Sequence, residues 1–194
     1  MVEAQKLRKE NYLNVAMMSR TALMAAVTAV AAQITIPLPF SPVPFTMQVL
    51  AVILSGLLLG PRYGALSQAI YVLVGAVGVP VFAGFAGGLG IVLGPTGGYL
   101  LSYPLAAAIA GLAAPAARDA PRRQALLMSV ATGIGALVVI YAVGASWLAV
   151  QSGLPPSVAL AQGVVPFVPL DLVKVVIAAL VATAAAPAIA PLRA

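Results

Sequence analysis

Long apolar stretches alternate with short connections, rich in glycine and proline or in positive charge, along the whole chain. A helix needs about 20 predominantly apolar residues to cross a bilayer core of roughly 30 Å. The pattern therefore predicts six membrane-spanning helices, at 17–37, 46–60, 63–79, 98–117, 124–150 and 166–190. Residues 1–16 form a polar segment before them, and we expect a single membrane domain over 1–194.

The second and third predicted helices are short, and only the sequence GPRYG at 60–64 separates them. Gly60, Pro61 and Gly64 interrupt a helix. We therefore expect these two helices to form an antiparallel hairpin. Glycines at 56, 60 and 64, like the alanine pairs Ala22/Ala26 and Ala25/Ala29, have the small-residue spacing that favours close helix packing.

Composition supports an all-α integral membrane protein. The chain is 62% hydrophobic and 7% charged, whereas about a quarter of the residues of a soluble domain are charged. It contains no cysteine and no histidine, which excludes disulfides, thiolate nucleophiles, imidazole bases and histidine-based metal sites. Apart from Asp171 the acids are Glu3, Glu10 and Asp119, all outside the spans. We expect no catalytic residues, no metal and no cofactor.

Positive charge marks alternate connections between the predicted spans. The connections at 38–45, 80–97 and 151–165 contain no charged residue. Nine of the ten cationic residues lie in the terminal segments, in the remaining connections or at the start of the first span: Lys6, Arg8, Lys9, Arg20, Arg62, Arg118, Arg122, Arg123 and Arg193. Because cytoplasmic loops collect Lys and Arg, we expect residues 1–16 and both termini in the cytoplasm, and a multi-pass protein of the cell membrane.

Two other interpretations of the basic residues are weaker. The basic N-terminus followed by TALMAAVTAVAA is typical of a signal peptide, but five further spans make that interpretation unnecessary. Nucleic-acid binding requires a basic face, whereas these cations are spread over several loops. We expect the lipid bilayer as a partner and no nucleic acid.

The tenth cation, Lys174, lies inside the sixth predicted span, three residues after Asp171. An ionised side chain at the bilayer centre costs about 2.5–3.5 kcal/mol even on insertion scales, and residues three apart share a helix face. The pair is either a self-neutralising contact between helices or a ligand site, and the two roles are compatible. In a site, Asp171 would accept from N–H groups and Lys174 would donate to a carboxylate or carbonyl.

The uncharged connections also contain candidate binding residues. IPLPFSPVPFTMQ has four prolines and predicts a stiff lid, after which Thr46 and Gln48 serve either a ligand or contacts between helices. In GVPVFAGFAGGLGIVLGPTGGY no lysine follows the glycines and no strand precedes them, which excludes nucleotide-binding motifs. Thr96 and Tyr99 there either face a site or simply begin a helix.

The chain resembles the BioY family, the biotin-binding substrate-capture (S) components of energy-coupling-factor (ECF) transporters. The resemblance covers residues 17–185 and depends on VPFTMQ, GVPVFAGFAGG, GPTGGY with LLSYPLAA, and PLDLVK, in that order. It implies the S-component fold, a six-helix bundle with a vitamin pocket near the outer face. It also implies a transmembrane T component and two ABC-type ATPases as partners, with no ATPase motif in this chain.

The resemblance also implies roles for individual residues. Asp171 and Lys174 correspond to the polar pocket residues of the sixth helix and would hold biotin. The matched loop motifs add further ligand-binding candidates, Thr46, Gln48, Phe82, Phe85, Gly98 and Tyr99. The alanine motif of the first helix corresponds to a partner-binding face, Ala22, Ala25, Ala26 and Ala29.

Three alternatives differ from a biotin-specific component. An S component for thiamin or riboflavin would favour several aromatic residues in the pocket loops, whereas Trp147, the one tryptophan, lies in the fifth span. A membrane enzyme would need a carboxylate pair or a metal cluster at membrane depth. A passive channel or packing protein would bind no specific ligand, and its buried ion pair would be structural.

Overall fold

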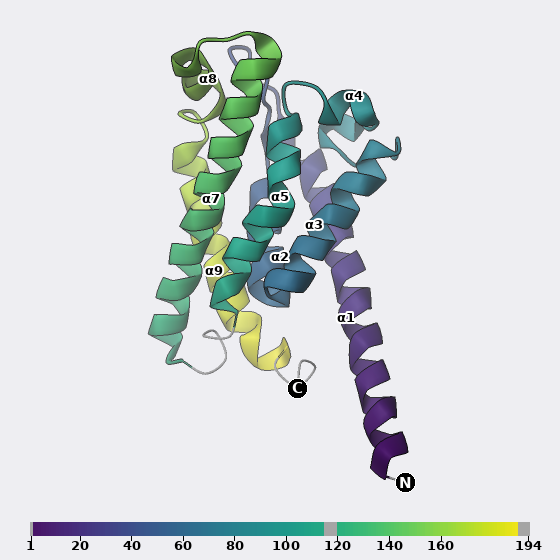
Figure 1. Ribbon diagram of the computed structural model, residues 1–194. Coiled ribbons are helices and arrows are strands. Elements are labelled where there is room, and N and C mark those ends of the chain that lie inside the picture. The colour runs from purple at the N-terminus through teal and green to yellow at the C-terminus, as the bar shows by residue number, and fades with distance from the viewer. Residues whose placement is uncertain (1, 115–119, 190–194) are drawn as a thin grey trace.

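The structure is a computed structural model that describes residues 2–114 and 120–189, and in these residues it is a bundle of helices (Figure 1). The bundle consists of α1 (Val2–Gln33), α2 (Gln48–Leu59), α3 (Pro61–Ala76), α5 (Gly97–Ala110), α7 (Arg122–Ser152) and α9 (Val168–Ile189). Successive helices run in alternating directions, so α1 begins and α9 ends at the lower end of the view. The same order of helices was predicted from the apolar stretches.

Short elements gather at the upper end of the bundle (Figure 1). They are the strands β1 (Thr35–Ile36) and β2 (Phe45–Thr46), the 3-10 turn η1 (Ala83–Phe85), and the helices α4 (Leu89–Val92) and α8 (Pro156–Gly163). The two strands pair antiparallel, with Thr35 opposite Thr46 and Ile36 opposite Phe45. At the lower end, η2 (Gly111–Ala113) extends α5 by one turn. η1, α4 and α8 lie in segments predicted as uncharged loops, whereas β1 lies in the predicted first span and β2 crosses the predicted start of the second.

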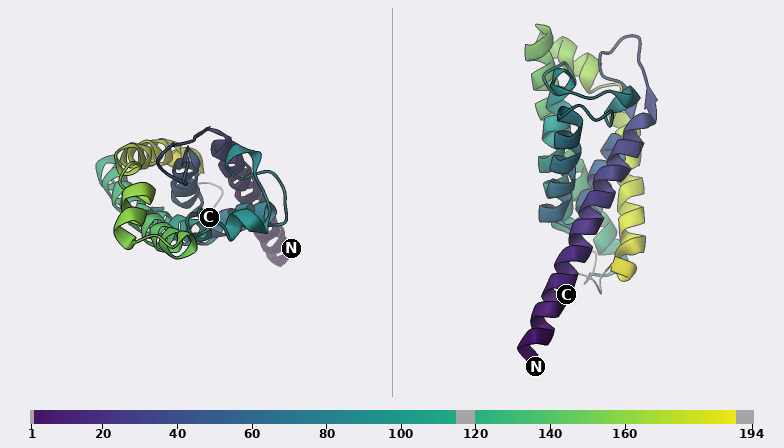
Figure 2. Two further views of the ribbon diagram at one scale, coloured as in Figure 1. Left: turned by 90° about the horizontal axis from the view of Figure 1, so that it is seen from above. Right: turned by 90° about the vertical axis from the view of Figure 1, so that its right-hand side faces the viewer.

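The first helix differs most from its predicted bounds. It begins at Val2 instead of residue 17 and ends at Gln33 instead of residue 37. The early end has a local cause, because the residue before a proline is biased away from the helical conformation. Ile36 precedes Pro37 and pairs with Phe45 in the short sheet. Figure 2 shows α1 lying obliquely against the other helices, with its first turns beyond their lower ends.

A glycine turn joins α2 to α3, as the sequence predicts. Gly60 has a positive φ of 83°, and its N–H donates to the Gly56 carbonyl at 2.7 Å. Pro61 then occupies the first turn of α3, where its missing N–H costs no helical hydrogen bond. A side chain at Gly56 would overlap the Ala107 carbonyl of α5, and one at Gly64 would overlap Gly56. The expected close packing at these glycines is confirmed.

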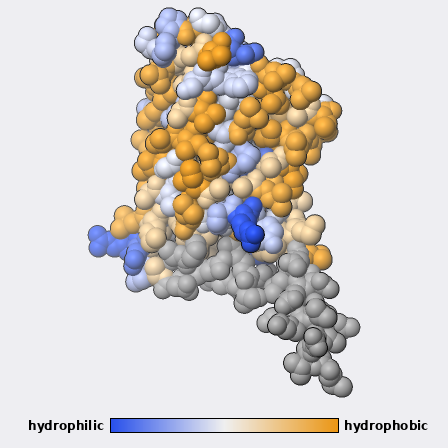
Figure 3. Space-filling view, viewed as in Figure 1, coloured by the Kyte–Doolittle hydropathy of each residue, from blue (hydrophilic) through white to orange (hydrophobic). Residues whose placement is uncertain are grey.

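Three helices within the described residues are long and apolar enough to cross a membrane: Val15–Gln33, Arg122–Ser152 and Val168–Ala186. Shorter apolar helices cover Gln48–Leu59 and Gly97–Ala113. Figure 3 shows apolar side chains over much of the height of the face in view, with strongly hydrophilic patches toward the ends. An apolar exterior of this kind is typical of a protein in contact with lipid.

Candidate functional site: a cavity beneath the upper loops

A cavity of ≈ 220 Å³ lies inside the upper half of the bundle. Its walls come from α2, α5, α7 and α9, and the segments before β2 and around η1, α4 and α8 cover part of it from above. The lining residues are Val43, Pro44, Thr46, Gln48, Val49, Phe82, Ala83, Ala86, Ile91, Thr96, Tyr99, Leu100, Tyr103, Ile140, Tyr141, Gly163, Phe167, Asp171 and Lys174. Mostly apolar walls with a few polar groups are typical of a small-molecule site.

The proline-rich loop at 37–44 covers part of this cavity, as a lid would. The Ser41 hydroxyl lies 2.8 Å from the Gln162 carbonyl of α8, and the Val43 N–H donates to the same hydroxyl at 3.0 Å. Val43 and Pro44 line the cavity below this contact. The loop is therefore attached to α8 above the cavity.

Asp171 and Lys174 form an ion pair in the cavity wall. Lys174 Nζ donates to Asp171 Oδ1 at 2.6 Å, and the two residues are only 2% and 4% exposed. Asp171 lies in the first turn of α9, where the positive end of the helix dipole stabilises a carboxylate. The predicted placement on one helix face is confirmed, and both side chains reach the cavity.

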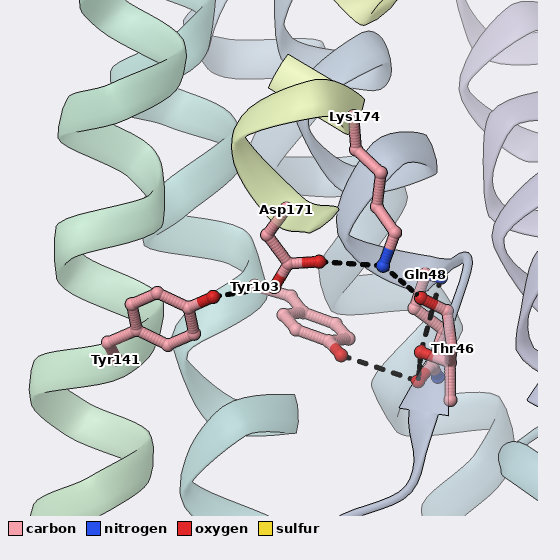
Figure 4. Close-up of polar contacts among 6 residues, drawn as sticks. All are labelled: Thr46, Gln48, Tyr103, Tyr141, Asp171 and Lys174. Carbon is pink, nitrogen blue, oxygen red and sulfur yellow. Dashed lines mark hydrogen bonds and ion pairs between the residues drawn. The ribbon is translucent and has the colours of Figure 1, made fainter. Parts of the chain in front are cut away.

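Lys174 has further partners on the short sheet. Nζ donates to the Thr46 carbonyl at 2.6 Å and lies 3.7 Å from the centre of the Phe45 ring. An ammonium group over an aromatic face gains a cation–π attraction. Lys174 therefore attaches β2 to α9 while it neutralises Asp171 (Figure 4).

A second cluster of polar groups surrounds Gln48 at the start of α2. The Thr46 hydroxyl donates to Gln48 Oε1 at 3.0 Å, and the Tyr103 hydroxyl of α5 lies 3.4 Å from the same oxygen. Gln48 Nε2 donates to the Tyr71 hydroxyl of α3. Thr46, Gln48 and Tyr103 line the cavity together with the ion pair and form its polar end (Figure 4), whereas Tyr71 is outside the lining.

The apolar part of the cavity contains Phe82 and Tyr99. Phe82 is 2% exposed, and its ring fills the space above Gly75, where a side chain would overlap it. The Tyr99 ring packs on Gly144 of α7 in the same way, while its hydroxyl donates to the Gly163 carbonyl at 2.8 Å. Tyr99 thus connects α5 to α8 below the covering loops.

Two of the residues predicted to bind a ligand lie outside the cavity lining. Phe85 is 71% exposed, because the backbone turns at Gly84 and directs its ring away from the cavity that Phe82 lines. Gly98 lies at the contact of α5 with α7, where a side chain would overlap Trp147. The matched motifs therefore contain both cavity residues and packing residues.

The alanines of α1 also differ in position. Ala22 and Ala26 are exposed, one turn apart on the surface of α1. Ala25 is 7% exposed and belongs to the apolar core, and Ala29 packs against that core. Within this chain, Ala22 and Ala26 are the two members of the motif that present an open surface.

Tyr103 and Tyr141 also line the cavity and were not predicted from the sequence. The Tyr141 hydroxyl of α7 donates to Asp171 Oδ2 at 2.7 Å, and Tyr103 is 4% exposed beside Gln48. A tyrosine inside an apolar span is itself a signal, because a buried hydroxyl usually requires a hydrogen-bond partner. The described residues contain no group of three or more His, Cys, Asp or Glu that could hold a metal ion.

The fold and the cavity together define a helical membrane protein with an internal site for a small molecule. The model of the BioY family matches residues 5–191 of the chain. This chain therefore belongs to the BioY family.

Individual relatives agree with the family assignment. A Pyrococcus horikoshii protein named as a probable biotin transporter BioY is 46% identical over 164 residues, which cover 84% of this chain and 92% of that protein. The Thermotoga maritima biotin transporter BioY is 43% identical over 163 residues, with coverages of 84% and 91%. A crystal structure described as the S-component for biotin from an ECF-type ABC transporter matches with a TM-score of 0.78 at 27% identity, over 88% of this chain and 90% of that one.

Proposed function

We propose that this protein is the biotin-binding S component of an ECF transporter. The relatives described above are named as biotin transporters. The fold matches a biotin S-component over most of both chains. The single observation that supports the proposal at the site is the buried Asp171–Lys174 pair, which faces a mostly apolar cavity. The protein is a transporter component and not an enzyme.

The cavity chemistry suits biotin. Biotin has two ureido N–H donors, a ureido carbonyl, an apolar thioether ring and a carboxylate on an apolar chain. Carboxylate oxygens accept more than one hydrogen bond each, so Asp171 has acceptor capacity for the ureido N–H groups beyond its bonds to Lys174 and Tyr141. Thr46 and Gln48 complete the polar end, while Phe82 and Tyr99 provide the apolar contact surface.

The proposed membrane arrangement has six spanning helices, namely α1, α2, α3, α5, α7 and α9. Arg62 and Arg122 lie at or next to the starts of α3 and α7, at the end of the bundle where α1 begins (Figure 1). The positive-inside rule would place this end, and both termini, in the cytoplasm. The cavity then lies near the outer face, where a substrate arriving from outside would enter.

The proposed partners are a transmembrane T component and a pair of ABC-type ATPases, which would supply the energy for inward delivery. The exposed Ala22 and Ala26 of α1 support a docking surface, because small side chains let another helix approach closely in a membrane. The single membrane domain over 1–194 would contribute the substrate site to this assembly.

A calorimetric titration of the detergent-purified protein tests the ligand. Biotin should give a saturable heat with a stoichiometry of one, while thiamin and riboflavin should give none. Binding of thiamin or riboflavin in place of biotin would assign the cavity to another vitamin. The absence of heat with biotin from folded, biotin-free protein would overturn the proposal.

A further inference from the structure

The segment from Phe82 to Ala86, here called the wall loop, closes on itself beside the cavity. The Phe82 N–H donates to the Ala86 carbonyl at 2.9 Å. Between them Gly84 has a φ of 68° and Phe85 a φ of 58°. Phe82, Ala83 and Ala86 line the cavity, so the conformation of this loop sets the shape of one cavity wall.

Phe85 is the one non-glycine residue with a positive φ in the part of the chain that the structure describes. A side chain with a Cβ disfavours this left-handed conformation. Such a residue persists when surrounding contacts impose its conformation, and these residues are concentrated at functional sites. The contact that holds Phe85 therefore determines the wall loop.

That contact comes from Gln33, the last residue of α1. Gln33 Oε1 accepts the Phe85 N–H at 2.9 Å. The same amide presents Nε2 to the Val81 and Phe82 carbonyls, at 3.3 and 3.2 Å, and to the Ala29 carbonyl of its own helix at 3.0 Å. One side-chain amide thus bonds the backbone at the start of the wall loop and at Phe85 within it.

The Val81 carbonyl continues this network toward the polar end of the cavity. It also accepts the Tyr71 hydroxyl at 3.1 Å, and Tyr71 in turn receives a hydrogen bond from Gln48. The Tyr71 ring meets the Phe82 ring edge to face, with centroids 5.6 Å apart. Hydrogen bonds therefore connect Gln33, which is not in the cavity lining, to Gln48, which is.

We propose that Gln33 is a positioning residue for ligand binding, which fixes the wall loop so that Phe82 packs against the bound molecule. This inference rests on the proposed biotin function, because biotin is the ligand whose binding it affects. Gln33 does not touch the ligand and acts through the backbone of the wall loop. A loop without this amide would populate other conformations, and biotin would leave more readily.

Gln33→Ala tests the inference by calorimetry and by the dissociation rate of radiolabelled biotin. We expect affinity to fall about tenfold or more, mainly through faster dissociation, as is common when a binding surface loses its preorganisation. Gln33→Glu keeps an acceptor for Phe85 but sets a carboxylate oxygen against the three carbonyls that Nε2 now contacts. It should also bind more weakly than wild type, which provides a second variant if Gln33→Ala folds poorly.

Two further variants separate positioning from a general loss of stability. Phe85→Gly in the Gln33→Ala background should recover part of the affinity, because glycine adopts a positive φ without strain. Gln151→Ala is the matched control, since Gln151 also donates from the end of a helix to a loop carbonyl, that of Leu93. Leu93 lies outside the cavity lining, so this control should leave biotin affinity unchanged.

The possible outcomes separate this inference from the proposed function. Wild-type binding of biotin with unchanged affinity and dissociation rate in Gln33→Ala would overturn the inference alone. Weakened binding that Phe85→Gly fails to restore would also contradict it, because the loss would not come from the wall loop. A wild-type protein that does not bind biotin would overturn the proposed function first.

Discussion

The Tyr141 hydroxyl donates a 2.7 Å hydrogen bond to Oδ2 of Asp171 and so joins α7 to α9 at the cavity. Lys174 Nζ donates to the other carboxylate oxygen, Oδ1, at 2.6 Å. The carboxylate is thereby held from two sides, and its direction is fixed before a ligand arrives. Preorganised polar groups of this kind raise affinity because less freedom is lost on binding.

Tyr141→Phe should weaken biotin binding by about 2- to 13-fold, because it removes one hydrogen bond with a net contribution of about 0.5–1.5 kcal/mol. Calorimetric titration measures the change. Tyr63→Phe is the control, since Tyr63 lies in the first turn of α3, away from the cavity lining. Equal affinities for Tyr141→Phe and wild type would show that Asp171 needs no orientation from α7.

Gly98→Ala should lower the melting temperature, because the added Cβ would overlap Trp147 at the contact of α5 with α7. Overpacking of this kind costs about 1–3 kcal/mol, or about 2–12 °C for a chain of this size. Gly90→Ala is the matched control, since nothing lies within 4 Å of a Cβ there. A thermal melt with equal midpoints for the two variants would contradict the packing role of Gly98.

Ala22→Trp and Ala26→Trp should leave biotin binding intact and abolish association with the T component and the ATPases. Both positions are exposed on α1, so the bulky ring costs the isolated protein little but prevents close approach of a partner helix. Co-purification with the energising module measures association. Leu105→Trp, at another exposed position, is the control, and normal assembly of both alanine variants would place the partner surface elsewhere.

Membrane orientation is testable with single cysteines, because the chain contains none. Ser157→Cys in α8 and Gln124→Cys in α7 replace exposed residues near opposite ends of the bundle. A membrane-impermeant maleimide added to intact cells should label Ser157→Cys, and it should label Gln124→Cys only after the membrane is opened. The reverse pattern would invert the proposed topology, and the parent chain controls for background labelling.

The apolar pattern predicted each long helix within a few residues, except the ends of α1 and the C-terminal end of α5. This success has a simple cause, since a membrane helix must satisfy its own backbone groups. Asp171 and Lys174 were also predictable, because two charges in an apolar span require a specific explanation. These features depend on residues that are close together in the sequence.

The remaining parts of the site depend on how the helices and loops meet in space. Tyr141 reaches Asp171 because its face of α7 is turned toward α9. The rotation of α7 about its axis depends on packing and cannot be deduced from the local sequence pattern. Phe82 and Phe85 are three residues apart in one loop, and the backbone conformation at Gly84 directs only Phe82 toward the cavity. Gly98 has no side chain whose chemistry could have indicated its contact with Trp147.

The Asp171–Lys174 pair is proposed to bind biotin and not to serve only as a structural ion pair. The single variant Asp171→Asn is ambiguous, because it leaves a buried ammonium group without its counter-ion, a loss of about 3–5 kcal/mol in buried pairs. The double variant Asp171→Asn/Lys174→Met removes both charges together. Replacing a buried ion pair by hydrophobic residues of similar volume is often neutral or stabilising, and the double variant avoids the unpaired buried charge of the single one.

A calorimetric titration of wild type and the Asp171→Asn/Lys174→Met variant with biotin is therefore the most direct measurement, with a thermal melt to confirm that both are folded. Two charged hydrogen bonds at about 1.5–3 kcal/mol each predict an affinity about 100-fold lower or more in the variant. Wild-type affinity in a folded double variant would contradict the account and leave the ion pair with a structural role alone.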